Sequence, residues 1–249
     1  MSTYTCSVTP DCLDGGGLAR IPAIYEMIIN SIGLHIKDEG FGINVMEGRG
    51  LSWTLARGAF EFGRRPSLYE KLTVSVCDGE KSALTTSRYV KIFDENGDTV
   101  ARAVADWCVI DKQTRKPTPF EVPSDNDLLH KPCPSPQRIR PFVSSRRSSR
   151  KVGYSECDFN GHLNNCRYVE MFYNLLPKRI ANRTEGVRLD INFLKEIPLG
   201  AQVVSYLKPG SYNDFQFCMQ HNGSPACCAA LAPIGECSCT GSLEGLFEH

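Results

Sequence analysis

The side chains best suited to chemistry lie between Tyr154 and Met171, in the run Y-S-E-C-D-F-N-G-H-L-N-N-C-R-Y-V-E-M. Asp158, Asn160 and His162 alternate, so an extended backbone would point all three the same way. The asparagines at 164–165 can then begin a helix with an apolar pattern. A helix N-terminus adds backbone N–H groups and a positive dipole end. Such a cluster can polarise a carbonyl group and aim a water molecule at it.

Two halves of the chain share one order of elements, a helix followed by four strands. Alternation of apolar and polar residues predicts the strands, as in V-R-L-D-I-N-F at 187–193, and D-E-N-G-D at 94–98 is a hairpin signal. The first half is expected to have a helix over 20–35 and strands over 51–62, 70–77, 82–94 and 99–111. The second is expected to have a helix over 164–177 and strands over 185–195, 201–208, 212–221 and 225–235.

Shifting the sequence against itself supports a duplication. A shift of 144 places Asp14 on Asp158, but it puts a glycine opposite Asn160 and a leucine opposite His162. A shift of 132 places Pro66 on Pro198 and an arginine, Arg64, opposite Glu196. The polar set therefore belongs to the second copy, which predicts one site per chain with the first half shaping a pocket.

The segment between the halves is rich in proline, serine and arginine. Seven prolines lie between 117 and 141, so this connection is expected to be mostly irregular. We expect a first domain over 1–118, a linker over 119–146 and a second domain over 147–249.

Bulk properties narrow the class of protein. Basic and acidic residues balance at 28 each, which argues against a nucleic-acid binder. No signal peptide and no apolar run of about 18 residues is visible, so no membrane span is expected and a cytoplasmic location is the default. The 12 cysteines include no C-x-x-C pair, which favours reduced thiols packed as small apolar residues over a zinc site.

Other common catalytic patterns are missing from the sequence. There is no G-x-S-x-G nucleophile elbow, no glycine-rich phosphate loop and no metal-like spacing among the remaining histidines. A basic cluster has two open interpretations, a docking rim for an acidic partner or a solvated linker and edge strand. Its members are Arg138, Arg140, Arg146, Arg147, Arg150 and Lys151.

The run Y-S-x-x-D-x-N-x-H-x-N-N-x-x-Y from Tyr154 to Tyr168 resembles the signature of acyl-ACP thioesterases. Three first-half segments extend the resemblance: G-L-S-W-T-L-A-R at 50–57, S-R-Y-V-K-I-F-D-E-N-G at 87–97 and W-C-V-I-D-K-Q-T-R-K-P at 107–117. The resemblance covers about residues 18–235.

This resemblance implies an α+β fold, a tandem or double hotdog in which each half wraps an antiparallel sheet around a long central helix. It implies hydrolysis of fatty acyl thioesters on acyl carrier protein, with no metal or organic cofactor. The catalytic residues that it implies are Asp158, Asn160, His162 and Glu196. Plant members carry a cysteine directly after that glutamate, where this chain has Ile197, so attack by water is the simpler mechanism.

The sequence leaves several points open. Either Glu196 or Asp158 could activate the water, while Asn160 and the N–H groups near Gly161 and His162 would face the carbonyl oxygen. Helix 20–35 and strand 51–62, which includes Trp53, are candidates to line an apolar tunnel. The alternatives are a hotdog hydrolase of acyl-CoA and a non-catalytic acyl-binding protein. The chain could be a monomer or a homodimer.

Overall fold

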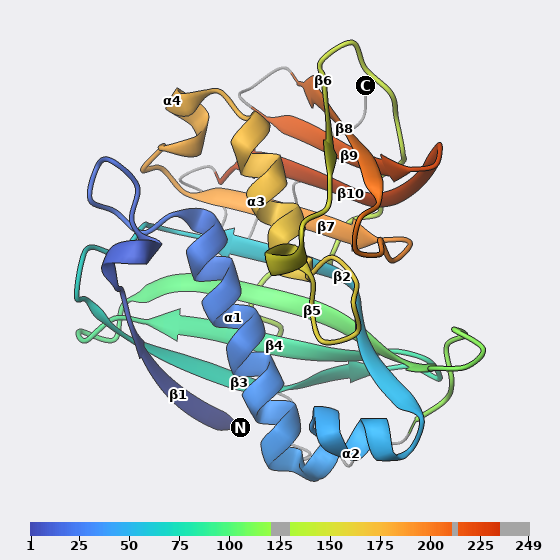
Figure 1. Cartoon of the computed structure of the whole chain (residues 1–249). Helices are drawn as coiled ribbons and strands as arrows, with labels where there is room; N and C mark the ends of the chain where they lie inside the picture. Colours follow the sequence, from blue (N-terminus) through green and yellow to red (C-terminus); the bar gives the residue numbers. More distant parts are fainter. Residues whose placement is uncertain (121–129, 211–213, 235–249) are drawn as a thin grey trace.

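A single curved sheet organises the chain. The computed structural model describes residues 1–120, 130–210 and 214–234. The ten strands of these residues pair antiparallel throughout, in the order β1-β3-β4-β5-β2-β7-β10-β9-β8-β6 (Figure 1). Read outwards from the β2–β7 pair, the two halves repeat one strand order, so the seam of the molecule lies between β2 and β7.

The bounds of the elements agree closely with the expected ones in both halves. The first half has β1 (Ser2–Ser7), α1 (Ile21–Ile36), α2 (Ile43–Gly48), β2 (Leu51–Phe62), β3 (Lys71–Lys81), β4 (Thr86–Phe93) and β5 (Thr99–Asp111). The second half has β6 (Arg147–Lys151), α3 (Asn165–Leu175), α4 (Lys178–Ala181), β7 (Val187–Phe193), β8 (Gln202–Pro209), β9 (Phe215–His221) and β10 (Ser224–Pro233). The expected strand ends at 212–213 and 235 lie outside the described residues.

Each half begins with an edge strand that the expected plan of one helix and four strands lacks. β1 pairs with β3 at one edge of the sheet, and β6 pairs with β8 at the other. A shift of 144 carries residues 2–7 onto 146–151, so these strands are copies of one another. The repeat unit is therefore five strands around a helix.

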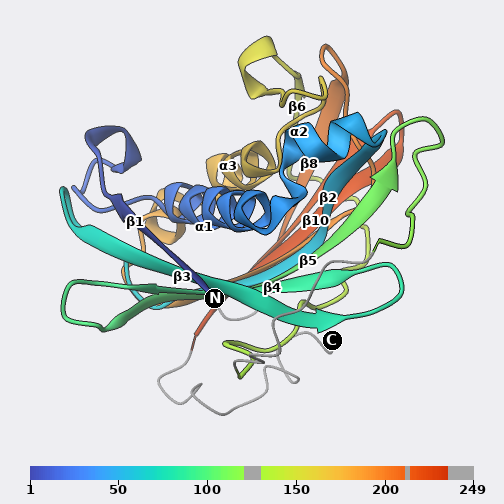
Figure 2. The ribbon, with the colours of Figure 1, turned by 90° about the horizontal axis from the view of Figure 1, so that it is seen from below.

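The two long helices lie side by side in the concave face of the sheet, as Figure 2 shows from below. α1 buries isoleucines at 21, 24, 28 and 32, which is the spacing of a helix face turned to a core. In α3, Phe172 stacks on Phe217 of β9 with ring centroids 5.1 Å apart. No helix of the described residues is long and apolar enough to cross a membrane.

The connection between the halves crosses the opposite, convex face. Residues 131–143 contain no helix or strand, as their prolines predict. The N–H groups of Gln137 and Ile139 donate to the side chains of Asp190 and Asn192 on β7, at 2.9 and 2.8 Å. Residues 121–129 of the expected linker lie outside the described part, and the domain limits at 118 and 147 stay predictions.

Candidate active site

The loop that carries the polar trio is a tight turn and not an extended strand. Oδ1 of Asp158 accepts the N–H groups of Asn160 at 2.9 Å and His162 at 3.2 Å. Gly161 adopts a φ of 74°, which glycine reaches at little cost. The prediction that the three side chains point the same way from an extended backbone is therefore wrong, because the aspartate curls the chain around its own carboxylate.

The N–H groups of this loop are also used differently from the prediction. Gly161 donates its N–H to the carbonyl of Asp158 at 3.0 Å, and that of His162 is held by the same residue's carboxylate. Neither can face a substrate carbonyl. Asn164 caps α3 as predicted, its side chain accepting the N–H of Cys166 at 2.8 Å. The N–H of Asn165, the first residue of α3, has no hydrogen-bond partner among the described residues.

Backbone pairing brings Glu196 to this loop from the end of β7. Leu163 donates its N–H to the carbonyl of Ile197 at 2.8 Å, and Leu199 donates to that of Gly161 at 3.0 Å. These bonds place Oε2 of Glu196 3.9 Å from Nε2 of His162. The structure thus brings the distant Glu196 together with His162 of the polar trio, although the catalytic roles of both residues stay predictions.

A second partner of Glu196 comes from the first half. Nη2 of Arg115, on the turn after β5, contacts the same Oε2 that faces His162. Sequence reasoning missed this residue, although it lies inside the T-R-K-P segment that carries part of the resemblance. Its place in the site follows from the packing of the two halves.

A cavity of about 770 Å³ opens beside the loop. This volume lies in the usual range for small-molecule sites, about 300–1,000 Å³. Asp158, Asn160 and Asn165 form part of its polar end, whereas neither His162 nor Glu196 lines it. The remaining wall is mostly apolar and comes from α1, α2 and β2, including Ile29, Leu34, Val45, Met46 and Trp53.

The lining confirms the prediction that helix 20–35 and strand 51–62, with Trp53, border an apolar space. It adds α2, which sequence reasoning missed. α1 ends in a π-helical turn, Lys37–Phe41, with Gly40 at a φ of 86°. This turn folds α2 back over the cavity, and the signal for it is the apolar I-x-V-M pattern at 43–46.

Two polar atoms at the site are buried with no hydrogen-bond partner in the part of the chain that the structure describes. They are Oδ1 of Asn160 and Nδ1 of His162. Buried polar groups in proteins are nearly always hydrogen-bonded, so such exceptions point to a site that awaits a ligand or water. An unpaired amide oxygen and an unpaired imidazole nitrogen beside a carboxylate can hold a water molecule, and the Nδ2 group of the same amide can donate to a carbonyl.

The cysteines next to the site are poor nucleophiles. Burial is the main cause that raises the pKa of Cys166, to about 12, and it also raises the pKa of Cys157. Thiols with a raised pKa hold little reactive thiolate at neutral pH. Ile197 fills the position after Glu196 with a fully buried apolar side chain. The groups of this candidate site that remain suited to chemistry are therefore the carboxylates, the amide and the imidazole.

The first half contains a loop with the same backbone hydrogen bonds but without the amide and imidazole side chains. Oδ1 of Asp14 accepts the N–H groups of Gly16 at 2.8 Å and Leu18 at 3.4 Å, and Gly17 has a φ of 80°. The backbone geometry of Asp158–Leu163 is thus kept, while the side chains that would face a substrate are absent.

The structural copies are offset by 131 residues in the segment that meets this loop. Ala19 donates its N–H to the carbonyl of Pro66 at 2.8 Å, as Leu163 does to that of Ile197, so Pro66 and Ile197 are equivalent positions 131 residues apart. The residue opposite Glu196 is therefore Arg65, and the prediction of Arg64 from the shift of 132 is wrong by one position. Nη2 of Arg65 donates to Oδ2 of Asp14 at 2.5 Å, so the first-half carboxylate is locked in an ion pair.

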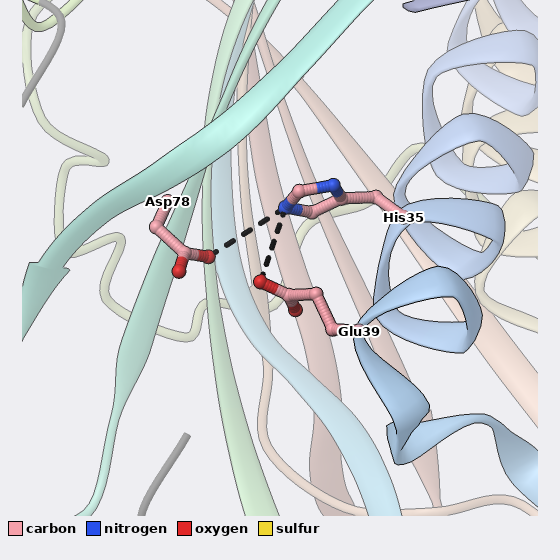
Figure 3. Close-up of side chains that lie close together, drawn as sticks. All are labelled: His35, Glu39 and Asp78. Carbon is pink, nitrogen blue, oxygen red and sulfur yellow. Dashed lines mark ion pairs between the residues drawn. The ribbon is translucent and has the colours of Figure 1, made fainter. Parts of the chain in front are cut away.

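One group of the described residues, on α1, the turn after it and β3, has the spacing of metal ligands (Figure 3). Nε2 of His35 is 3.5 Å from Glu39 and 3.7 Å from Asp78. The fully buried guanidinium of Arg88 lies 3.0 Å from each of the two carboxylates. Because a cation already balances them, we interpret this group as an ion-pair network that ties the end of α1 to β3 and β4.

Comparisons with known proteins match both halves. The model of the acyl-ACP thioesterase N-terminal domain matches residues 4–125, and that of the C-terminal domain matches residues 141–226. A chloroplastic acyl-[acyl-carrier-protein] hydrolase of Cuphea viscosissima is 24% identical over 189 residues. That match covers 70% of this chain, and the chain spans 45% of the length of that relative.

Solved structures share the architecture. An acyl-ACP thioesterase from Bacteroides thetaiotaomicron is 27% identical with a TM-score of 0.81, covering 92% of this chain and 96% of its own. The 12:0-ACP thioesterase of Umbellularia californica is 15% identical with a TM-score of 0.80, covering 94% and 97%. The double hotdog fold expected from the resemblance is therefore confirmed.

Proposed function

This chain belongs to the acyl-ACP thioesterase family, and on that premise we propose that it hydrolyses the thioester of fatty acyl groups on acyl carrier protein. The observation that carries the proposal is the polar loop 158–165 at one end of a largely apolar cavity of about 770 Å³. A fatty acyl chain gains about 0.8 kcal/mol for each methylene that it buries in such a space. The thioester at its end would then lie beside the loop.

We assign the water-activating role to Asp158. Its Oδ1 holds the loop, and its Oδ2 has no hydrogen-bond partner among the described residues. Asp158 also lines the cavity, whereas Glu196 does not and is already paired with Arg115. A carboxylate that faces the substrate is better placed to take a proton from water than one held by a guanidinium.

The reaction proceeds through an oxyanion. Water attacks the carbonyl carbon and gives one proton to Asp158, and the amide of Asn160 and the N–H of Asn165 stabilise the oxyanion. His162, paired with Glu196, orients the water. The C–S bond then breaks, the carboxylic acid is released, and the thiolate recovers the proton from Asp158. No metal or organic cofactor is required for these steps.

The decisive experiment compares carriers and chain lengths. The purified protein is incubated with a panel of fatty acyl-carrier thioesters and with the matching acyl-CoA esters, and free thiol and free fatty acid are measured. We expect faster turnover of the carrier-bound series. Faster turnover of acyl-CoA would support a CoA hydrolase, and bound fatty acyl thioester that is never cleaved would support a non-catalytic binding protein.

A further inference from the structure

Glu196 meets partners from both halves of the molecule at a single oxygen. Its Oε2 contacts Nη2 of Arg115 and lies 3.9 Å from Nε2 of His162. We propose that Arg115 is a positioning residue, whose guanidinium holds the carboxylate of Glu196 beside His162. The proposal rests on the proposed function and adds to it a contribution of the first half to the chemistry.

His162 alone does not fix this carboxylate. A separation of 3.9 Å is too long for a hydrogen bond, which needs about 2.7–3.2 Å. Glu196 is exposed at the end of β7, with 38% of its side chain accessible, so without a partner it would move among rotamers in solvent. The contact with Arg115 is the interaction that limits this motion.

Hydrogen bonds within the turn after β5 fix the backbone from which the side chain of Arg115 extends. Oδ1 of Asp111 accepts the N–H groups of Gln113 at 3.1 Å and Thr114 at 2.7 Å, and the N–H of Arg115 bonds to the carbonyl of Asp111 at 2.8 Å. Arg115 has a φ of 56°, a region that favours glycine. Glycine would adopt this conformation at less cost, so the turn itself does not call for an arginine, and the contact of its side chain with Glu196 gives a reason for one.

Because the Arg115–Glu196 ion pair is exposed, its removal can be expected to affect activity without a matching loss of folding stability. Side chains of Arg115 and Glu196 are 36% and 38% accessible, and ion pairs this exposed add little to folding. Replacing Arg115 with glycine would also relieve the positive φ. Arg115→Gly should therefore fold at least as well as the wild type, and any loss of activity would come from the lost guanidinium.

The test is the kinetics of Arg115→Gly. We expect kcat to fall about 10- to 100-fold with KM little changed, because small misplacements of catalytic groups have costs of this size. The loss should be equal with acyl-carrier substrates and with a small thioester. Arg115→Lys should recover part of the rate, and guanidinium ion added to Arg115→Gly should raise it.

Tyr69→Gly is the matched control. Tyr69 also has a positive φ, 61°, and is 69% exposed, but it belongs to the loop before β3 in the first half. That variant should keep the wild-type kcat. If the wild type is active and Arg115→Gly equals it, the positioning role is overturned. A loss confined to carrier-linked substrates would also overturn it, whereas an inactive wild type would instead refute the proposed function.

Discussion

At the scale of single residues, Asn160 and Asp158 contribute to the loop in different ways. Asn160 supports the turn with its backbone N–H, while its side-chain oxygen is buried and has no hydrogen-bond partner among residues 1–120, 130–210 and 214–234. Asp158 supports the turn with its side chain. Asn160 can therefore lose its side chain without loss of the loop, whereas Asp158 can be changed safely to asparagine, which keeps an accepting oxygen.

Replacing Asn160 by alanine should lower kcat about 10²–10³-fold, the usual cost of one oxyanion donor. The melting temperature should stay near that of the wild type because the backbone bond remains. Single-turnover hydrolysis of an acyl-carrier thioester measures the effect on the chemical step. A variant as fast as the wild type would remove Asn160 from the proposed mechanism.

At the scale of elements, one turn design serves two purposes. In the second half the aspartate of the turn lines the cavity, and in the first half it is paired with Arg65, whose side chain is 3% exposed. Burial opposes ionisation of Asp14, but the hydrogen bond and charge of Arg65 and the N–H of Gly16 outweigh it, so the pKa of Asp14 is lowered. We therefore expect the same substitution to affect activity in the second-half turn and stability in the first-half turn.

Asp158→Asn should lower kcat about 10²-fold, the scale of lost general base catalysis, with little change in stability. Asp14→Asn should leave kcat unchanged and lower the free energy of unfolding at pH 7 by about 1–3 kcal/mol, as a charged hydrogen bond is lost. Because the pKa of Asp14 is lowered in the fold, its contribution is present above the unfolded pKa and is lost as the pH falls through the folded one.

Urea denaturation of Asp14→Asn and the wild type, at pH 7 and under acid conditions, measures this difference. The gap between the two proteins should close in acid. A gap that stays constant with pH, or a loss of kcat in Asp14→Asn, would show that the ion pair with Arg65 does not have this role.

Periodic patterns made most elements predictable from the sequence. β2 and β5 match their expected bounds, since long alternating runs such as Leu51–Phe62 specify a strand with one face buried. The sequence did not predict β1 because Ser2–Ser7 is short and half-polar. This segment becomes a strand through its antiparallel pairing with β3. Short edge strands carry a weak local signal, so tertiary pairing decides them.

Sequence reasoning named candidate residues for the site, whereas their geometry follows only from the structure. The resemblance named Asp158, Asn160, His162 and Glu196, and the fold brings the last two within 3.9 Å. The turn escaped prediction because a carboxylate that accepts two backbone N–H groups overrides the alternating pattern. The pairing of Glu196 with a first-half arginine could not be read locally, since it arises from contact between distant segments.

At the scale of the whole molecule, the halves are joined by strand pairing and by buried charge. Across the seam Glu61 lies opposite Arg188, which is 1% exposed and also donates to Asp190 at 2.7 Å. Basic and acidic residues balance over the chain, so any steering of an acidic carrier protein must be local. The exposed basic strand β6, at the edge of the sheet next to β8, is the place where the two open interpretations of the basic cluster can be tested.

Arg147→Glu should raise KM for acyl-carrier substrates about two- to fivefold, the scale of one exposed charge contact, and leave kcat unchanged. A small thioester should show no change. Lys71→Glu is the matched control, since Lys71 is exposed beside the opposite edge of the sheet and pairs in register with Ser7. Equal effects on both substrates would assign β6 the role of a solvated edge strand.

The first-half turn around Asp14 also has a use in protein design. Its backbone already has the hydrogen bonds and the left-handed glycine of the second-half loop, and the positions equivalent to Asn160, His162 and Glu196 are Gly16, Leu18 and Arg65. Reactive side chains grafted onto this loop would therefore start from a backbone that already has the required conformation. In such a duplicated protein, one backbone geometry can therefore carry the polar set in one copy and lack it in the other, with no change of architecture.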